Sequence, residues 1–182
     1  MENDNTGVSI TINAQAYEDI INSILYQAPL EIGVEIAVYM LLFGIIDRDK
    51  YSILDINSMH KNKAKVYSKM IVDEISKVPD IVIVDKPFEY NQGEINDNNN
   101  IGAYGIIEIK GLSVNYSKEE YEAQKENANH FIWTNGIRWV FDGNEDKTIV
   151  LSANSDENGK YNIDNSQFKN LIIKLKQLEW NK

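Results

Sequence analysis

Glu108 and Lys110 stand two residues apart within the apolar run 104–112. Side chains two apart on a β-strand point to the same face, so this acid and this lysine should lie side by side. A strand this apolar is typical of the centre of a sheet, where charged groups are rarely buried without partners. Asp80 opens a second apolar run, 81–84. If the two runs pair as a hairpin, Asp80 reaches Glu108, and two carboxylates and a lysine converge.

Such a convergence predicts metal-dependent phosphodiester hydrolysis. Two carboxylates a few ångströms apart repel, and one takes up a proton unless a cation lies between them. Mg²⁺ or Mn²⁺ suits oxygen ligands of this kind, so we expect Asp80 and Glu108 to bind one of these ions. The ion would polarise a phosphate and activate a bound water, while Lys110 would orient that water or stabilise charge on the phosphate. The alternative is a structural ion pair beside a turn aspartate.

A third carboxylate is expected from a helix over residues 29–45. Glu31 and Glu35 are four residues apart and share a helical face. Glu35 lies between Val34 and Ile36, in the most apolar part of the helix, so we prefer Glu35 as the third metal ligand. The alternative is a solvent-facing acid on an amphipathic helix.

Gln124 is the remaining candidate for the catalytic site. In a helix predicted over 118–130 it falls on the face of Tyr121, Ala128 and Phe131, which should pack inward. A glutamine there must find hydrogen-bond partners, and it could bind the attacking water or the lysine. The alternative is a buried amide satisfied within the fold. His60 and His130 are not spaced as a ligand pair, and we expect both to be structural or surface residues.

The elements that must position these side chains alternate between helices and strands. Asn13 is a predicted helix N-cap, Ser117 and Glu120 form a predicted capping box, and Asn135-Gly136 predicts a hairpin with a two-residue turn. Periodicity predicts helices over 14–26, 29–45, 64–77, 118–130 and 167–180, and strands over 51–56, 81–84, 104–112, 131–134, 137–142 and 148–152. This order predicts an α/β fold with a helix crossing between strands.

Composition limits the classes of function. A chain of 182 residues with 43% hydrophobic residues suits one soluble globular domain. It has no cysteine, no signal-like start and no apolar run near the ~20 residues of a spanning helix, so we expect a cytoplasmic protein without a membrane partner. The net charge of −10 opposes tight binding to phosphates. We therefore expect weak DNA binding by the chain alone, with a homodimer or partner subunit supplying more surface.

In this order, Pro79-Asp80, Glu108-Ile109-Lys110 and a helix with Gln124 resemble the PD-(D/E)XK nuclease superfamily. The stretch 131–142 resembles the Thr-Asn-Gly hairpin, continued by aromatic residues, that follows the catalytic core in nuclease domains of type I restriction motor subunits and their stand-alone relatives. The resemblance covers about residues 30–142. Relatives that carry the glutamine often have a tyrosine four residues later, where this chain has Ala128.

The resemblance implies a restriction-endonuclease-like α/β fold, a mixed β-sheet core flanked by helices. One domain would span 1–182, with a C-terminal strand and helix at 147–180. It also implies a Mg²⁺-dependent endodeoxyribonuclease, with Asp80 and Glu108 as metal ligands, Lys110 as the catalytic lysine and Glu35 as the helical acid. We expect a role in restriction or phage defence.

Two other functions stay open. The negative charge favours a non-catalytic module of the same fold that binds a protein partner or acts as an acidic, DNA-mimic-like regulator. Action on RNA or a modified nucleotide is a third hypothesis. The sequence shows no cluster of aromatic and basic residues of the kind that binds RNA, so nothing in it favours this hypothesis.

Overall fold

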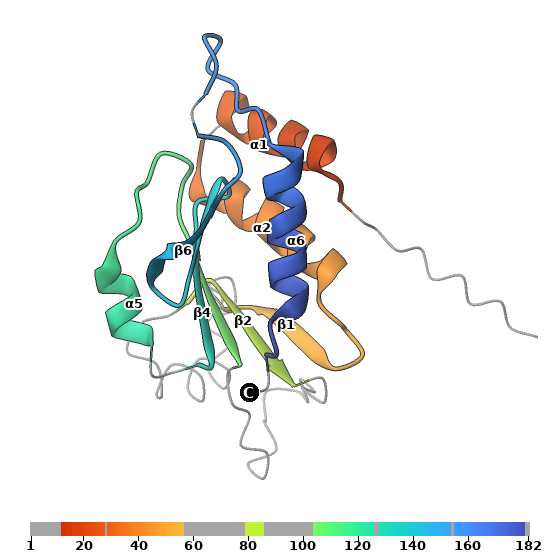
Figure 1. The fold of residues 1–182 in the computed structure, drawn as a ribbon, viewed down its shortest axis with the longest axis vertical. Helices are drawn as coiled ribbons and strands as arrows, with labels where there is room; N and C mark the ends of the chain where they lie inside the picture. Colours follow the sequence, from red (N-terminus) through yellow and green to blue (C-terminus); the bar gives the residue numbers. More distant parts are fainter. Residues whose placement is uncertain are drawn as a thin grey trace, which may run out of the picture.

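The computed structural model describes residues 12–27, 29–56, 79–85, 104–125, 128–153 and 155–180, and these form a mixed α/β fold (Figure 1). Within these described ranges, four helices and six strands follow in the order α1 (Ala14–Gln27), α2 (Glu31–Ile45), β1 (Tyr51–Asp55), β2 (Ile81–Asp85), β3 (Gly105–Ile109), α5 (Lys118–Gln124), β4 (His130–Thr134), β5 (Arg138–Phe141), β6 (Asn144–Val150) and α6 (Asn165–Gln177). The predicted α/β class is confirmed, and the helix predicted over 64–77 lies outside the described residues. No described helix is long and apolar enough to cross a membrane.

The six strands form one mixed sheet in which spatial order follows chain order, from β1 to β6. Four of the five neighbouring pairs are antiparallel. β3 and β4 are parallel, and α5 lies in the connection between them. β2 and β3 pair with Ile81 opposite Ile107, so the hairpin expected from the two apolar runs is confirmed.

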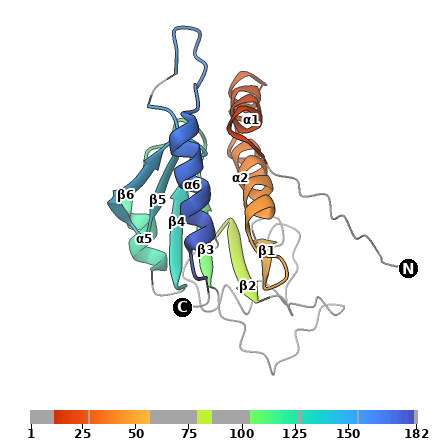
Figure 2. The same ribbon diagram turned by 45° about the vertical axis from the view of Figure 1, so that its right-hand side comes forward.

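Helices cover both faces of the sheet. α1, α2 and α6 lie on one face (Figures 1 and 2), which we call the three-helix face. α5 lies on the other, which we call the α5 face. Strand alternation divides the apolar side chains: Ile107 and Ile109 pack in the core of the three-helix face, whereas Ile106 and Trp133 pack in the core of the α5 face. Glu108 is therefore turned to the α5 face.

The β4–β5 hairpin differs by one residue from the turn that Asn-Gly predicts. Asn135 N–H donates to the Arg138 carbonyl (3.3 Å), and only Gly136 in this turn has a positive φ, of 86°. Gly136 and Ile137 are thus the central residues, as in a turn that needs glycine at its first central position. The Asn135 side chain braces the turn instead of lying at its centre: Oδ1 accepts from the N–H groups of Ile137 (3.1 Å) and Arg138 (2.8 Å).

α5 is shorter than predicted, because it ends at Gln124 and His130 already begins β4. From His130 onward the chain is a strand and not a helix, because its backbone groups pair with β3. The His130 N–H, for example, donates to the Tyr104 carbonyl (3.0 Å). Phe131 consequently lies on a strand and not on the predicted helix. The expected inward packing of Tyr121, Ala128 and Phe131 is nevertheless confirmed, because all three lie in the core of the α5 face.

Candidate active site

The register of β2 and β3 brings Asp80 to Glu108. Ile81 lies opposite Ile107 in this antiparallel pair, so the residue before Ile81, Asp80, lies beside the residue after Ile107, Glu108. Opposite residues on an antiparallel pair have Cβ atoms about 4.5–5.5 Å apart. Asp80 Oδ2 also accepts a hydrogen bond from the backbone N–H of Ile109 at 2.6 Å. Both acids are buried, with exposed fractions of 6% for Asp80 and 7% for Glu108.

Lys110 lies between two carboxylates. Its ammonium contacts Glu108 Oε1, and Glu120 Oε1 of α5 lies 3.4 Å away. The Lys110 backbone N–H donates to the Thr134 carbonyl (2.9 Å), which holds the residue against the end of β4. The structure thus brings Asp80, Glu108 and Lys110 together, as strand alternation and the hairpin predict.

Among the described residues, the site holds more negative charge than the Lys110 ammonium balances. Burial raises the pKa of Asp80, as do the charges of Glu108 and Glu35, although the Ile109 N–H and Lys110 oppose the rise; the result is a pKa of about 7 instead of 3.8. For Lys110, burial disfavours the charged form. The hydrogen bond and charge of Glu108, with the charges of Glu120 and Asp80, outweigh burial and raise the pKa of the ammonium. Asp80 therefore titrates near neutral pH beside a lysine that stays charged.

Glu35 is buried in α2, with an exposed fraction of 4%, whereas Glu31 is exposed. Of the two acids, Glu35 is therefore the one that points inward, and its role as a metal ligand stays a prediction. Glu35 lies within electrostatic reach of Asp80, because its charge contributes to the raised pKa. It also lines a pocket of about 290 Å³ that it shares with Asp55 and with apolar side chains of α2.

The three acids do not form a preassembled chelating cluster. Among the described residues, no group of three or more His, Cys, Asp or Glu side chains is arranged to hold a metal ion. The layers explain this: α2 packs on the three-helix face, whereas Glu108 is turned to the α5 face. Asp80 and Glu108 still fit a hard divalent ion in donor chemistry, because they are adjacent buried carboxylates whose mutual repulsion a cation would relieve. These two carboxylates would supply two ligands to the ion, and Glu35 stays a predicted third ligand.

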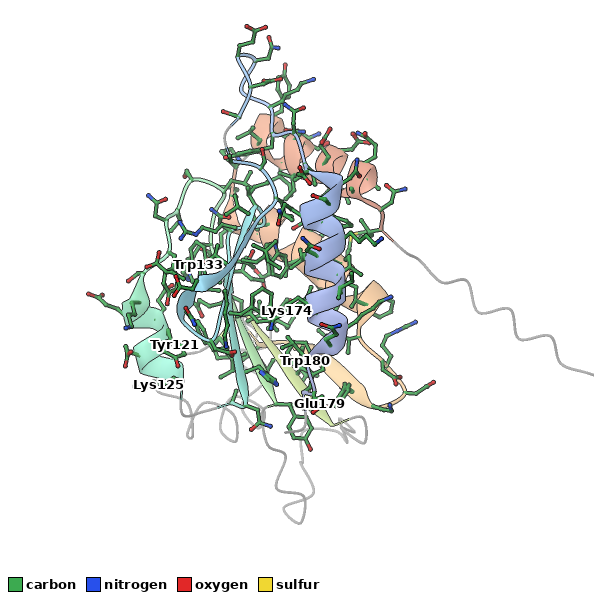
Figure 3. All side chains as sticks on the ribbon, viewed as in Figure 1. Tyr121, Lys125, Trp133, Lys174, Glu179 and Trp180 are labelled. Atoms are coloured by element: carbon green, nitrogen blue, oxygen red, sulfur yellow. The ribbon has the colours of Figure 1, made fainter. Side chains whose placement is uncertain are left out.

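Gln124 is the last residue of α5, and its side chain lies outside the described part of the chain. Its predicted contact with a water or the lysine stays a prediction. Tyr121, one turn earlier, points from α5 to the sheet (Figure 3) and packs on Phe131 with ring centroids 5.5 Å apart. His60 is also outside the described residues.

His130 fastens the C-terminal segment. Its Nε2 lies 3.1 Å from the Glu179 carbonyl, and its ring packs edge-on against Trp180, with centroids 5.7 Å apart. Glu179 and Trp180 lie at the foot of α6 (Figure 3). The carboxylate of Asp142, 3.9 Å from Nδ1, raises the pKa of His130. A structural role for His130, as expected, agrees with these contacts.

Glu120 is the site residue that sequence reasoning did not single out. Its place three residues after Ser117 predicted a capping role. The Ser117 hydroxyl does cap α5, accepting from Glu119 N–H at 3.3 Å, but the Glu120 carboxylate is turned to Lys110. The available signal was topological: Glu120 lies in the first turn of the helix that crosses from the lysine-bearing strand to its parallel neighbour.

Comparisons of the chain with protein-family models, with curated proteins and with solved structures find no match. The likeness to PD-(D/E)XK nucleases therefore rests on the motifs of this sequence alone, and function must be argued from the site.

Proposed function

We propose that this protein is a divalent-metal-dependent nuclease that hydrolyses phosphodiester bonds in DNA, with a restriction-endonuclease-like fold. The observation that carries the proposal is the meeting of Asp80 with Glu108 and Lys110, from segments 28 residues apart, at one buried site. Adjacent buried acids repel and do not stabilise a fold by themselves, and they are typical of sites that take up a cation.

Each residue has a defined role in this proposal. Asp80 and Glu108 hold Mg²⁺ or Mn²⁺, with Glu35 as a third carboxylate from α2. The ion supplies Lewis-acid polarisation of the phosphate and acidification of water. Lys110, whose ammonium stays charged because its pKa is raised, stabilises negative charge that develops on the phosphate oxygens. Gln124 is proposed to orient the attacking water.

The charge of the whole chain limits how it meets DNA. With a net charge of −10, the chain has little long-range attraction for phosphates. We propose that a second copy or a partner subunit contributes to DNA binding, and that substrate affinity falls steeply as salt rises.

A cleavage assay with matched variants tests the proposal. Supercoiled DNA is incubated with the full chain and Mg²⁺ or Mn²⁺, and the rate is compared with that in EDTA. Asp80→Asn keeps the acceptor for Ile109 N–H and removes the charge, and Lys110→Met keeps the length of the side chain. Each should lower the rate by about 100-fold or more, the usual loss for a group that stabilises the transition state. Glu119→Gln, an exposed neighbour on α5, is the matched control and should cleave like the wild type.

The result that contradicts the proposal is cleavage by Asp80→Asn and Lys110→Met at the wild-type rate.

The acidic charge favours a second candidate, a non-catalytic module that occupies a basic site on a protein partner. The net charge of −10 and pI of about 4.7 are the observations in its favour. The two candidates differ in their response to metal. A nuclease site at a metal concentration 100 times its Kd gains about 2.7 kcal/mol of stability, whereas the module gains none. A flat melting temperature in Mg²⁺ and Mn²⁺, with intact DNA, favours the module.

A further inference from the structure

In the part of the chain that the structure describes, Lys110 has two carboxylate partners, and they come from different elements. Glu108 lies on β3, which ends one residue before Lys110, and Glu120 projects from α5, 3.4 Å from the ammonium. We propose that Glu120 is a positioning residue, which keeps the Lys110 ammonium at the site when Glu108 binds a divalent cation. This inference rests on the proposed function, because it requires a cation at Asp80 and Glu108.

Aromatic side chains next to Glu120 along the chain hold the start of α5 against the sheet. Tyr121, the next residue, packs its ring on Phe131, and it passes so close to Gly143 that a Cβ there would meet the ring at 2.2 Å. Just before α5, Tyr116 packs edge-on against the buried Trp133, with centroids 5.5 Å apart. These contacts on either side of Glu120 fix the first turn of α5 relative to the sheet, so its carboxylate has a defined position.

When a cation binds Glu108, the Lys110 ammonium needs a second carboxylate to stay at the site. An ammonium has three donors and can serve both carboxylates at once. A divalent ion that binds Glu108 weakens the hold of that carboxylate on Lys110 and repels the ammonium, because like charges at such distances interact strongly in a partly buried site. The side chains of Lys110 and Glu120 are each only 20% exposed, so solvent screens their attraction incompletely. With Glu120 the ammonium remains beside the cation. Without Glu120 it moves out to water.

The test follows the ammonium itself by NMR. In the full chain labelled with ¹⁵N, a side-chain ammonium held by carboxylates gives a visible ¹H–¹⁵N signal, and one released to water exchanges too fast to be seen. At saturating Mg²⁺, the Lys110 signal should persist in the wild type and in Glu119→Gln, and it should disappear in Glu120→Gln. The glutamine is isosteric and Ser117 still caps α5, so folding should be preserved; circular dichroism checks it. The turnover rate kcat of Glu120→Gln at saturating Mg²⁺ should fall by about 10-fold, as for other residues that orient a catalytic group.

The outcomes separate the two proposals. If Mg²⁺ binds, seen as a shift of the Ile109 amide that donates to Asp80, and Glu120→Gln keeps the Lys110 signal, the role of Glu120 is overturned and the proposed function stands. Loss of the signal in the wild type on Mg²⁺ addition also overturns the role of Glu120. If Mg²⁺ moves no resonance near Asp80 in any variant, the proposed function and this inference both fail.

Discussion

Replacing Asp80 by asparagine should stabilise the metal-free protein at high pH, even though it removes a residue of the candidate active site. Asp80 is buried beside Glu108, and its pKa is raised from 3.8 to about 7. Above that pKa, folding must keep an ionised carboxylate next to other acids. Asparagine has the same shape, and its carbonyl can still accept the hydrogen bond of Ile109 N–H.

The size of the effect follows from proton linkage. Because the native pKa lies above the unfolded value, the folded protein binds the extra proton, and stability falls as pH rises from about 4 to about 7. A rise from 3.8 to about 7 corresponds to about 4 kcal/mol across the whole window, at about 1.4 kcal/mol per pH unit. Between about pH 5 and about pH 8.5, Asp80→Asn should therefore gain about 3 kcal/mol relative to the wild type.

Urea unfolding of both proteins in EDTA, at a series of pH values from 5 to 8.5, measures this difference. Comparing the change with pH cancels any constant effect of the asparagine amide. Mg²⁺ at 100 times its Kd should narrow the difference by about 2.7 kcal/mol, because only the wild type then gains binding energy at this site. A stability difference between the two proteins that does not change with pH would refute the reasoning, because Asp80 would then titrate alike in both states.

Three further predictions concern the scaffold. Gly143→Ala should destabilise the protein by about 3 kcal/mol in urea unfolding, because its φ is 62° and a Cβ would lie 2.2 Å from Tyr121. The control Gly159→Ala, with φ of 79° but nothing within 4 Å, should lose only about 1 kcal/mol, and equal losses would contradict the steric argument. Asn135→Ala should lower the free energy of unfolding by about 2–4 kcal/mol, because the buried side chain makes four hydrogen bonds to backbone groups. A loss under about 1 kcal/mol would show that the turn forms without this side chain. His130→Gln should be less stable than the wild type below about pH 6.5, and the difference should shrink as pH rises through the raised native pKa of His130. A difference that stays constant across the pH series would exclude the Asp142 pairing as its source.

Sequence patterns predicted the parts of the site that depend on local alternation and on one hairpin. The two-residue period set Glu108 and Lys110 on one face, and the turn-rich segment between two apolar runs predicted the pairing that brings Asp80 to them. The burial of Glu35 was predictable for the same kind of reason, because its immediate neighbours in α2 are apolar. Asn13 caps α1 as predicted, accepting from Ala16 N–H at 2.8 Å.

The remaining features depend on tertiary contacts that no local pattern records. α5 ends at Gln124 and β4 pairs with β3 from His130, so strand pairing takes over before the end of a helical periodicity that continues to His130. Glu120 has an obvious local role as a capping residue, and only the packing of α5 on the sheet reveals Lys110 as its partner. The turn at Gly136 is shifted by one residue because the Asn135 side chain bonds to Leu112 and Val114, in a segment distant along the chain.

A crystal of the full chain soaked in Mn²⁺ and measured at the manganese absorption edge would decide whether the two carboxylates form a metal site. We predict one anomalous peak about 2.1 Å from oxygens of both Asp80 and Glu108, the spacing expected for a small divalent ion, with the Lys110 ammonium retained by Glu120. Saturating Mn²⁺ that leaves Asp80 on the Ile109 N–H and Glu108 on Lys110, with no peak between the two carboxylates, would contradict the proposed nuclease.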